Sequence, residues 1–146
     1  MVKDVDFPPV WLAGFALAGY LLGRIFPVHL AANDYIGAVL VVIALIIAVL
    51  SVLQMLLSRT TVVPRREPSA LVTRGLFAQT RNPIYLADTI LLAGLYFAWD
   101  ALVALPLALI FMEVIKRRFI LDEERRLLAR FGDAFEDYCA RTRRWL

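Results

Sequence analysis

The stretch IGAVLVVIALIIAVLSVLQMLL, residues 36–57, carries no charged side chain and decides the fold class. A helix of about 20 consecutive apolar residues is long enough to cross a bilayer. The whole chain has 146 residues, of which 61% are hydrophobic, against roughly 45–50% in soluble domains. A soluble domain of this size could not bury that much apolar surface. The sequence therefore predicts an integral membrane protein.

Three more apolar segments accompany this stretch. Together the four segments predict one domain, residues 1–146, built as an all-α bundle of four transmembrane helices. The last two spans are short and are separated only by Asp100, so we expect a tight helical hairpin. The segment after them, residues 119–138, is amphipathic and too charged to span. It is expected to form a cytoplasmic helix that lies against the membrane or caps the bundle. The predicted spans are residues 8–26, 36–57, 85–99 and 101–115.

Basic residues cluster between the second and third spans and again after the fourth span, and the formal net charge is +3. The positive-inside rule places both clusters in the cytoplasm. With four spans, both termini and any site near these clusters then lie on the cytoplasmic side of an inner or plasma membrane. The cations of the two clusters are Arg59, Arg65, Arg66, Arg74, Arg81, Lys116, Arg117 and Arg118.

The sequence offers few residues for metal chemistry. Cys139 is the only cysteine, which argues against a disulfide framework and a cysteine metal cage. His29 is the only histidine, so a histidine metal site or a catalytic triad is not expected. We therefore expect no metal. We also expect no nucleic-acid partner, because the basic clusters flank the spans and are explained by topology and lipid contacts.

The first candidate site is residues 71–85, which join the basic loop to the third span. Gly75 permits backbone conformations that other residues avoid, and Pro83 fixes a helix start and holds Asn82 extended. Arg81 and Asn82 then lie at the positive end of a helix at the membrane boundary, where an anionic group is favoured. The alternative is an arginine that anchors to lipid phosphates beside an asparagine cap.

The second candidate site is the acidic run Asp122-Glu123-Glu124. On a helical wheel, Glu124 falls near the centre of the apolar stripe and Glu123 lies on its flank. A carboxylate on an apolar face is costly unless a partner satisfies it. That partner is either a ligand with a cationic or hydroxyl group, or an arginine of this chain, namely Arg117, Arg118 or Arg81.

Two acids lie within the predicted spans, where ionisable groups are functional candidates by default. Glu113 precedes Lys116 and Arg117 by three and four residues, so an ion pair on one helix face is expected. Asp88 has no such neighbour. It is either a buried partner of Arg81, seven residues earlier, or a catalytic or acceptor-binding group.

The first span contains Gly19-Tyr-Leu-Leu-Gly23, a spacing of small residues that lets helices approach closely. Such a pattern usually serves packing between helices of one chain. The alternative is a homodimer through the first span. The pattern alone does not distinguish these two uses.

The two candidate sites together resemble the family of integral membrane methyltransferases that includes isoprenylcysteine carboxyl methyltransferase and the phospholipid N-methyltransferases. The resemblance covers about half of the chain, from Ser69 to the end. It depends on the order and spacing of short motifs and on their placement relative to the spans. The matching residues are Leu71-Val72-Thr73-Arg74-Gly75, Phe77, Arg81-Asn82-Pro83-Ile84-Tyr85, Glu123-Glu124, Leu127, Phe131-Gly132, Tyr138 and Arg144-Trp145.

The resemblance implies a pocket for S-adenosylmethionine on the cytoplasmic side, with S-adenosylhomocysteine as product. It assigns a polar part of the cofactor to Glu123, whereas the helical wheel favours Glu124, so both are candidates. The acceptor is expected to be a lipid or another lipophilic molecule with an amine, carboxylate or thiol. Within residues 69–146, the expected cofactor-binding residues are Ser69, Ala70, Leu71, Val72, Gly75, Phe77, Asn82, Pro83, Tyr85, Glu123 and Glu124.

The chain departs from the family pattern in two places. The family's histidine is Asn82 here, which cannot accept a proton near neutral pH. The substrate-binding arginine of the isoprenylcysteine enzymes is Phe119 here, with Arg118 beside it, so a prenylated-cysteine substrate is not implied. We expect direct in-line methyl transfer, with Asp88 assisting an amine acceptor. The catalytic candidates are Asp88, Arg81 and Arg118.

Two other functions fit parts of the pattern. A sterol-type membrane reductase that uses NADPH ends in a similar Glu-Glu and Phe-Gly stretch, but this chain is short and lacks a further basic phosphate site. A non-enzymatic membrane scaffold whose C-terminal helix docks a partner would explain the amphipathic segment. A scaffold gives no reason for Gly75, Arg81-Asn82-Pro83 and the glutamate pair to occur together.

Overall fold

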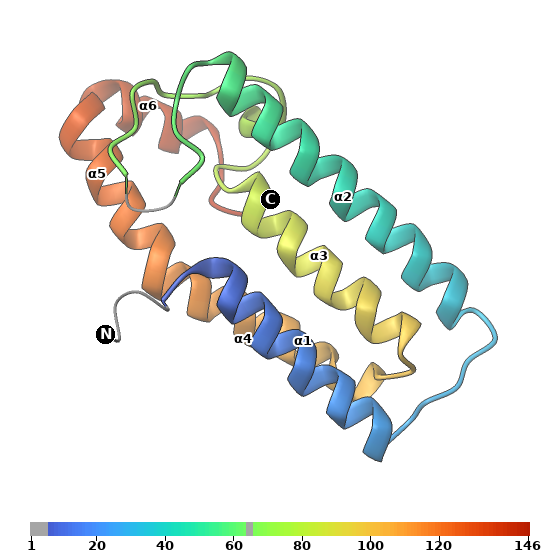
Figure 1. Ribbon diagram of the computed structural model, residues 1–146. Helices are drawn as coiled ribbons and strands as arrows, with labels where there is room; N and C mark the ends of the chain where they lie inside the picture. The colour runs from blue at the N-terminus through green and yellow to red at the C-terminus, as the bar shows by residue number, and fades with distance from the viewer. Residues whose placement is uncertain (1–5, 64–65) are drawn as a thin grey trace.

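The computed structural model describes residues 6–63 and 66–146, and within these residues every regular element is a helix (Figure 1). The all-α prediction is confirmed. Of the described helices, one is long and apolar enough to cross a membrane by itself, Asn33–Leu57, and Pro83–Ala98 is a shorter apolar helix. The elements are α1 (Pro8–Ile25), α2 (Asn33–Leu57), η2 (Gly75–Ala78), α3 (Pro83–Ala98), η3 (Leu102–Ala104), α4 (Leu105–Ile115), η4 (Lys116–Ile120), α5 (Leu121–Phe131) and α6 (Asp133–Arg141).

Helix α3 is the central helix of the bundle, with α2 along one side and α1 and α4 along the other (Figure 1). Its Leu92 and Tyr96 side chains are fully buried. Small residues allow α2 to approach closely, because a Cβ added at Gly94 would lie 3.0 Å from the backbone nitrogen of Val41. Candidate site residues lie at the start of this central helix, so the surrounding helices position them.

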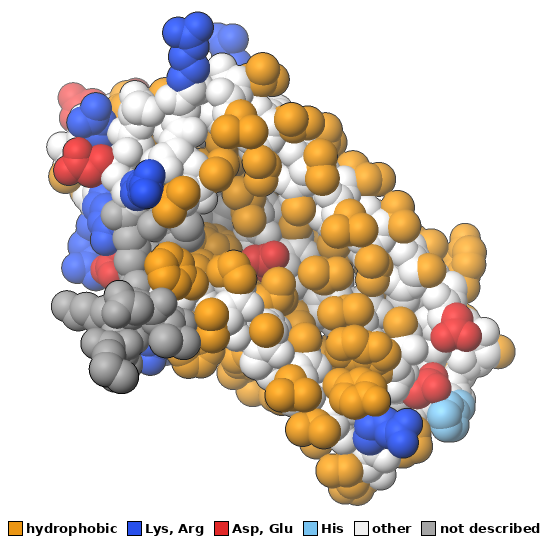
Figure 2. Space-filling view, viewed as in Figure 1, with side chains coloured by type: hydrophobic (Ala, Val, Ile, Leu, Met, Phe, Trp, Pro, Cys, Tyr) orange, Lys and Arg blue, Asp and Glu red, His pale blue; other side chains and the backbone are white. Residues whose placement is uncertain are grey.

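The outward faces of the helices are apolar, most clearly on α2. The side chains of Val42, Leu45 and Ile46 are each more than half exposed. Figure 2 shows hydrophobic side chains spread over α1 and α2 on one face of the molecule. Contiguous apolar surface of this extent marks contact with a membrane or a partner, and it agrees with the membrane location predicted from composition.

The glycines of α1 pack against α3 and the turn after it. A Cβ added at Gly19 would lie 2.0 Å from Cε1 of Tyr96, and one added at Gly23 would lie 2.6 Å from Cβ of Ala101. The GxxxG spacing therefore serves close packing within the chain. A homodimer through α1 would have to use other faces of this helix, and it stays a prediction.

The hairpin between α3 and α4 turns at Asp100, as predicted. Asp100 has a φ of +54°. Its carboxylate accepts a hydrogen bond from Asn33 Nδ2 at 2.7 Å and lies 2.6 Å from His29 Nδ1. These contacts tie the turn to the loop between α1 and α2 and to the first residue of α2, at the end of the bundle opposite the candidate site (Figure 1).

The C-terminal amphipathic segment differs from the prediction in two ways. It does not begin as a separate helix, because α4 continues through the π-helical turn η4 into α5. It is also not a single helix, because Gly132 adopts a φ of +52°, which ends α5 before α6 begins. Glycine reaches positive φ at little cost and is common where helices end. The bend brings α6 against the loop before α3, where Tyr138 Oη donates a hydrogen bond to the Phe77 carbonyl at 2.6 Å.

Candidate functional site

The loop before α3 is shaped by Gly75 and Pro83, the two residues that the sequence indicated. Gly75 has a φ of +61°, and a Cβ there would lie 1.7 Å from Nε2 of Gln54. Gly75 therefore lets the loop pack on the end of α2. Pro83 begins α3, and the buried side chain of Asn82 before it donates a hydrogen bond to the Arg144 carbonyl at 2.9 Å. The loop is thus fastened at one end to α2 and at the other to the C-terminal tail.

Arg81 connects this loop to the tail and to α5. Its Nη1 donates hydrogen bonds to the carbonyls of Thr142 at 2.8 Å and Cys139 at 3.3 Å. Its Nη2 lies 3.0 Å from Oε1 of Glu124. Arg144 binds the same carboxylate at two points, with Nε 2.9 Å from Oε1 and Nη2 2.7 Å from Oε2. Of the alternatives that the sequence left open for the acidic run, the structure shows the pair with Arg81 for Glu124.

Arg81, Glu124 and Arg144 form what we call the tail cluster. Burial alone would raise the pKa of Glu124, but the hydrogen bonds and charges of Arg144 and Arg81 outweigh it and hold this pKa below its ordinary value. The Arg81 side chain is only 12% exposed, so its charge needs a paired anion. The tail cluster therefore fixes the C-terminal tail against the loop before α3.

Glu123 lies in a different environment from Glu124. Its Oε1 accepts a hydrogen bond from Tyr85 Oη at 2.8 Å, the only hydrogen bond that it makes among the described residues. Burial raises the pKa of Glu123 above its ordinary value, and the Tyr85 hydrogen bond and the charge of Arg126 offset only part of that rise. A buried carboxylate with so few partners is costly. Glu123 is therefore the glutamate of the pair that is available to a ligand.

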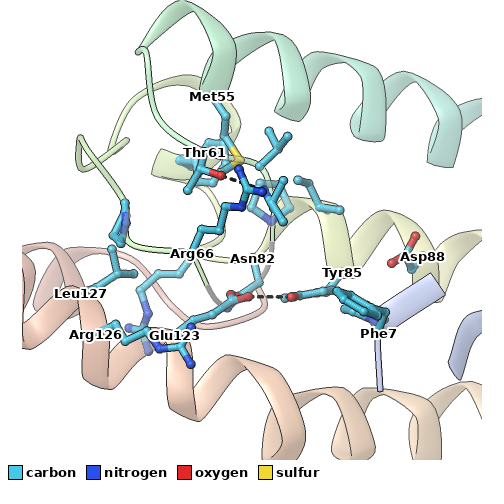
Figure 3. Close-up of a pocket in the computed structure, with 18 of the residues that line it drawn as sticks. Phe7, Met55, Thr61, Arg66, Asn82, Tyr85, Asp88, Glu123, Arg126 and Leu127 are labelled. Atoms are coloured by element: carbon cyan, nitrogen blue, oxygen red, sulfur yellow. Dashed lines mark hydrogen bonds between the residues drawn. The ribbon is translucent and has the colours of Figure 1, made fainter. Parts of the chain in front are cut away.

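Two adjoining cavities meet at Glu123. The larger has a volume of about 490 Å³ and runs between the start of α1, the end of α2, α3 and α5 (Figure 3). The smaller, of about 120 Å³, lies beneath the loop before α3 and against α5 and α6. The two share enough wall to form one continuous site. The residues that line both are Met55, Thr61, Pro68, Phe77, Arg81, Asn82, Glu123 and Leu127.

Most of the predicted cofactor-binding residues line these cavities. Ser69 and Gly75 do not, because the exposed Ser69 hydroxyl donates a hydrogen bond to the Arg59 carbonyl and Gly75 packs on Gln54. The predicted residues that line the smaller cavity are Ala70, Leu71, Val72, Phe77, Asn82, Glu123 and Glu124. Those that line the larger are Phe77, Asn82, Pro83, Tyr85 and Glu123.

Arg118, a predicted catalytic residue, lies away from both cavities. Its guanidinium carbon is 4.6 Å from the centre of the Trp11 ring, and its Nη1 is 3.2 Å from Oδ1 of Asp6. These three residues line a separate open groove of about 510 Å³ between α1 and α4. The structure therefore does not bring Arg118 together with Asp88 and Arg81, because the helix that runs from α4 into α5 directs this side chain toward α1.

Asp88 lies in the larger cavity, one helical turn beyond Tyr85 (Figure 3). Among the described residues it has no hydrogen bond and no ion pair, and Arg81 pairs with Glu124 instead. The predicted alternative of an Asp88–Arg81 pair is therefore wrong. Glu113, by contrast, pairs with Lys116 at 3.1 Å and Arg117 at 2.5 Å, as predicted.

Sequence reasoning missed lining residues that come from distant parts of the chain. Phe7 and Met55 line the larger cavity from the start of α1 and the end of α2. No local pattern marks them, because apolar residues are common on every helix of this protein. Arg126 also lines this cavity. Its spacing of three residues from Glu123 places it on the same helix face, a signal that could have revealed it.

Residues 33–134 match the family model described as phospholipid methyltransferase. This match covers more than half of the chain and includes α2, the loop before α3, α3 and α5, which supply most of the residues that line the two cavities. Neither the curated proteins nor the solved structures include a match. The chain therefore belongs to the phospholipid methyltransferase family of membrane proteins.

Proposed function

We propose that the protein is an enzyme that transfers the methyl group of S-adenosylmethionine to an amine of a membrane lipid. The observation that carries this proposal is the position of Glu123, where the small cavity beneath the basic loop meets the larger cavity that extends to Asp88. A polar donor and a lipophilic acceptor can approach this point from different sides. Membership of the phospholipid methyltransferase family supports methyl transfer to a lipid.

The cavities fit the size and chemistry of the donor. Ligand sites commonly measure about 300–1,000 Å³, so a nucleoside-bearing donor would fill the smaller cavity and extend into the larger. Glu123 offers the carboxylate oxygen that Tyr85 does not use, and a hydroxyl or cationic group of the donor would satisfy it. Phe77 and Leu127 line both cavities and supply apolar wall for an adenine ring.

Methyl transfer of this kind needs position more than it needs an acid or a base. S-adenosylmethionine, when bound, supplies a methyl group that is attached to a sulfonium. When the methyl group transfers to the acceptor, the sulfur becomes the neutral thioether of S-adenosylhomocysteine. The residues of the chain hold the two reactants in line, and orientation is worth roughly 7–11 kcal/mol in favourable cases. The tail cluster keeps α6 and the tail fastened to the loop that covers the smaller cavity.

Asp88 favours an amine acceptor over a carboxylate or a thiol. An unpaired carboxylate in the cavity attracts an ammonium group and repels another carboxylate. It can also take up the proton that the nitrogen loses when the new nitrogen–carbon bond forms.

We expect Asp88→Asn to lower turnover about a hundredfold, in the range of general acid–base effects. Asp34→Asn, at an exposed acid on the far end of α2, is the matched control, and full turnover by Asp88→Asn across pH would remove the role.

We also infer four spans with the site on the cytoplasmic side. The basic loop, η4 and the site occupy one end of the bundle (Figure 1), which the positive-inside rule assigns to the cytoplasm. Helix α3 has only 16 residues, but its neighbours shield it, so it crosses as a core helix. The acceptor then reaches Asp88 from the bilayer between α1 and α2, where Figure 2 shows a hollow in the apolar face with an acidic side chain in it.

Mass spectrometry of lipids from expressing cells tests the function. A species heavier by one methyl group should require the wild-type protein and disappear with Glu123→Gln. It should persist with Glu136→Gln, because that exposed residue of α6 lines neither cavity. Titration of the purified protein with S-adenosylhomocysteine and with NADPH separates a transferase from a reductase. Binding of NADPH alone would favour the reductase, and binding of neither would favour a scaffold.

A further inference from the structure

Arg126 of α5 is a cation at the site that the proposed reaction leaves without a role. It lines the larger cavity, on the same helix as Glu123 (Figure 3). Its Nη1 is buried and has no hydrogen-bond partner among the residues that the structure describes. The next residue along the chain behaves differently, because Arg125 is 77% exposed and pairs with Asp122. Two adjacent arginines thus differ in both burial and pairing.

The other two arginines that line the larger cavity differ from Arg126. Arg81 belongs to the tail cluster, although its Nε is also buried without a hydrogen bond among the described residues. Arg66 is exposed, so solvent can satisfy its charge. Arg126 forms no ion pair with any described residue. Its positive charge acts to lower the pKa of Glu123. A guanidinium nitrogen left buried and unpaired costs more than its hydrogen bond would contribute. An ion or a ligand that accepts a hydrogen bond from this nitrogen would remove the cost.

We propose that Arg126 binds an oxyanion of a ligand in the larger cavity. The identity of the ligand rests on the proposed function: the oxyanion is either the carboxylate of the donor's amino-acid part or the phosphate of the acceptor's headgroup. The planar guanidinium offers parallel N–H groups that match both kinds of oxyanion. The cavity then has a cationic residue, Arg126, at its α5 wall and an anionic residue, Asp88, on α3.

Calorimetric titration of the full chain in detergent tests the donor source. S-adenosylhomocysteine carries the carboxylate, and 5′-methylthioadenosine lacks the whole amino-acid part. If the donor supplies the oxyanion, Arg126→Gln weakens binding of S-adenosylhomocysteine about ten- to hundredfold, as expected for a hydrogen bond to a charged group, and leaves 5′-methylthioadenosine unchanged. Arg125→Gln is the matched control and should bind both ligands as the wild type does.

Glycerol 3-phosphate, titrated in the presence of S-adenosylhomocysteine, tests the acceptor source. If the headgroup supplies the oxyanion, Arg126→Gln loses binding of this phosphate and keeps that of both nucleosides. Arg126→Lys keeps the charge but lacks the parallel N–H groups of the guanidinium, so its affinity should fall between those of the wild type and Arg126→Gln. Circular dichroism verifies that each variant folds. If Arg126→Gln does not fold, the affinity of Arg126→Lys decides the test.

The proposal is overturned if the Arg126 variants bind all three ligands as tightly as the wild type, or if Arg125→Gln loses as much. A wild-type protein that binds glycerol 3-phosphate through Arg126 but binds no nucleoside would keep the oxyanion site and remove the methyl-transfer proposal. A wild-type protein that binds none of the three would overturn both.

Discussion

At the scale of single residues, Glu123 and Glu124 show how one step along a helix changes the role of a carboxylate. Successive positions of an α-helix are rotated by about 100°, so the two side chains face different surroundings. Glu124 meets Arg81 and Arg144 at the tail. Glu123 meets Tyr85 and the two cavities. The carboxylate of Glu124 therefore stabilises the folded chain, and that of Glu123 is available to a ligand.

Substitution of each glutamate by glutamine should separate these roles. We expect Glu124→Gln to lower the free energy of unfolding by about 1–3 kcal/mol at neutral pH, because it removes hydrogen bonds to two arginines and leaves Arg81 without its anion. Glu123→Gln should unfold no more easily than the wild type, because it removes a buried charge. Denaturant titrations in detergent measure both. Equal losses of stability would contradict the division.

The pH dependence of Glu124→Gln follows from the sign of the pKa shift. The folded-state pKa of Glu124 is lowered, so its contribution to stability is present above the ordinary pKa of a glutamate and is lost as the pH falls through the lowered value. The difference in stability between wild type and Glu124→Gln should therefore shrink on acidification. A difference that grows toward acid pH would be inconsistent with this assignment.

Donor binding should have its own pH dependence, which depends on Glu123. Burial raises the pKa of the ligand-free carboxyl, whereas a hydroxyl or cationic donor group favours the ionised form. Binding then requires loss of a proton at low pH, so affinity for S-adenosylhomocysteine should rise as the pH rises through this pKa and then level off. Calorimetry over pH measures it, and Glu123→Gln should show no such rise.

At the scale of elements, the contact between α1 and α3 depends on glycine at one position and not at another. A Cβ at Gly19 would overlap the Tyr96 ring at 2.0 Å, whereas one at Gly14 would meet nothing within 4 Å. We expect Gly19→Ala to destabilise the protein by about 1–3 kcal/mol through overpacking. Gly14→Ala is the matched control and should be neutral or stabilising, because alanine is the better helix former. Thermal unfolding that ranks them in the opposite order would contradict the packing described.

At the scale of the whole molecule, the site lies at one end of an apolar bundle and the Asp100 turn at the other (Figure 1). Four spans would put these two ends on opposite sides of the membrane. In a Cys139→Ser background, a membrane-impermeant maleimide should label Ala31→Cys on intact cells. Ala129→Cys should react only after permeabilisation. Both positions are exposed, so labelling of both from outside would reject the proposed orientation.

Much of the architecture could be predicted because it is local. The spans differ from α1, α2 and α3 by only a few residues at their ends, since apolar length and helix-starting prolines act over short distances. The break at Gly132 was missed because the apolar residues keep their helical spacing across it, whereas the helical backbone conformation is interrupted there. The continuous run from α4 into α5 was missed because a change from apolar to charged residues need not interrupt helical hydrogen bonding.

Sequence alone determined that the chain is an apolar helical membrane protein, and its short motifs indicated the loop before α3 and the glutamate pair as one site. Only the tertiary structure decided that Glu124 pairs with Arg81 and Arg144 while Glu123 lines both cavities, and that Arg118 points elsewhere. It also showed that Nη1 of Arg126 is buried without a hydrogen-bond partner among the described residues. The physical reason is that helical periodicity gives the direction of a side chain relative to its own helix. What lies in that direction is set by the packing of residues far apart in the chain.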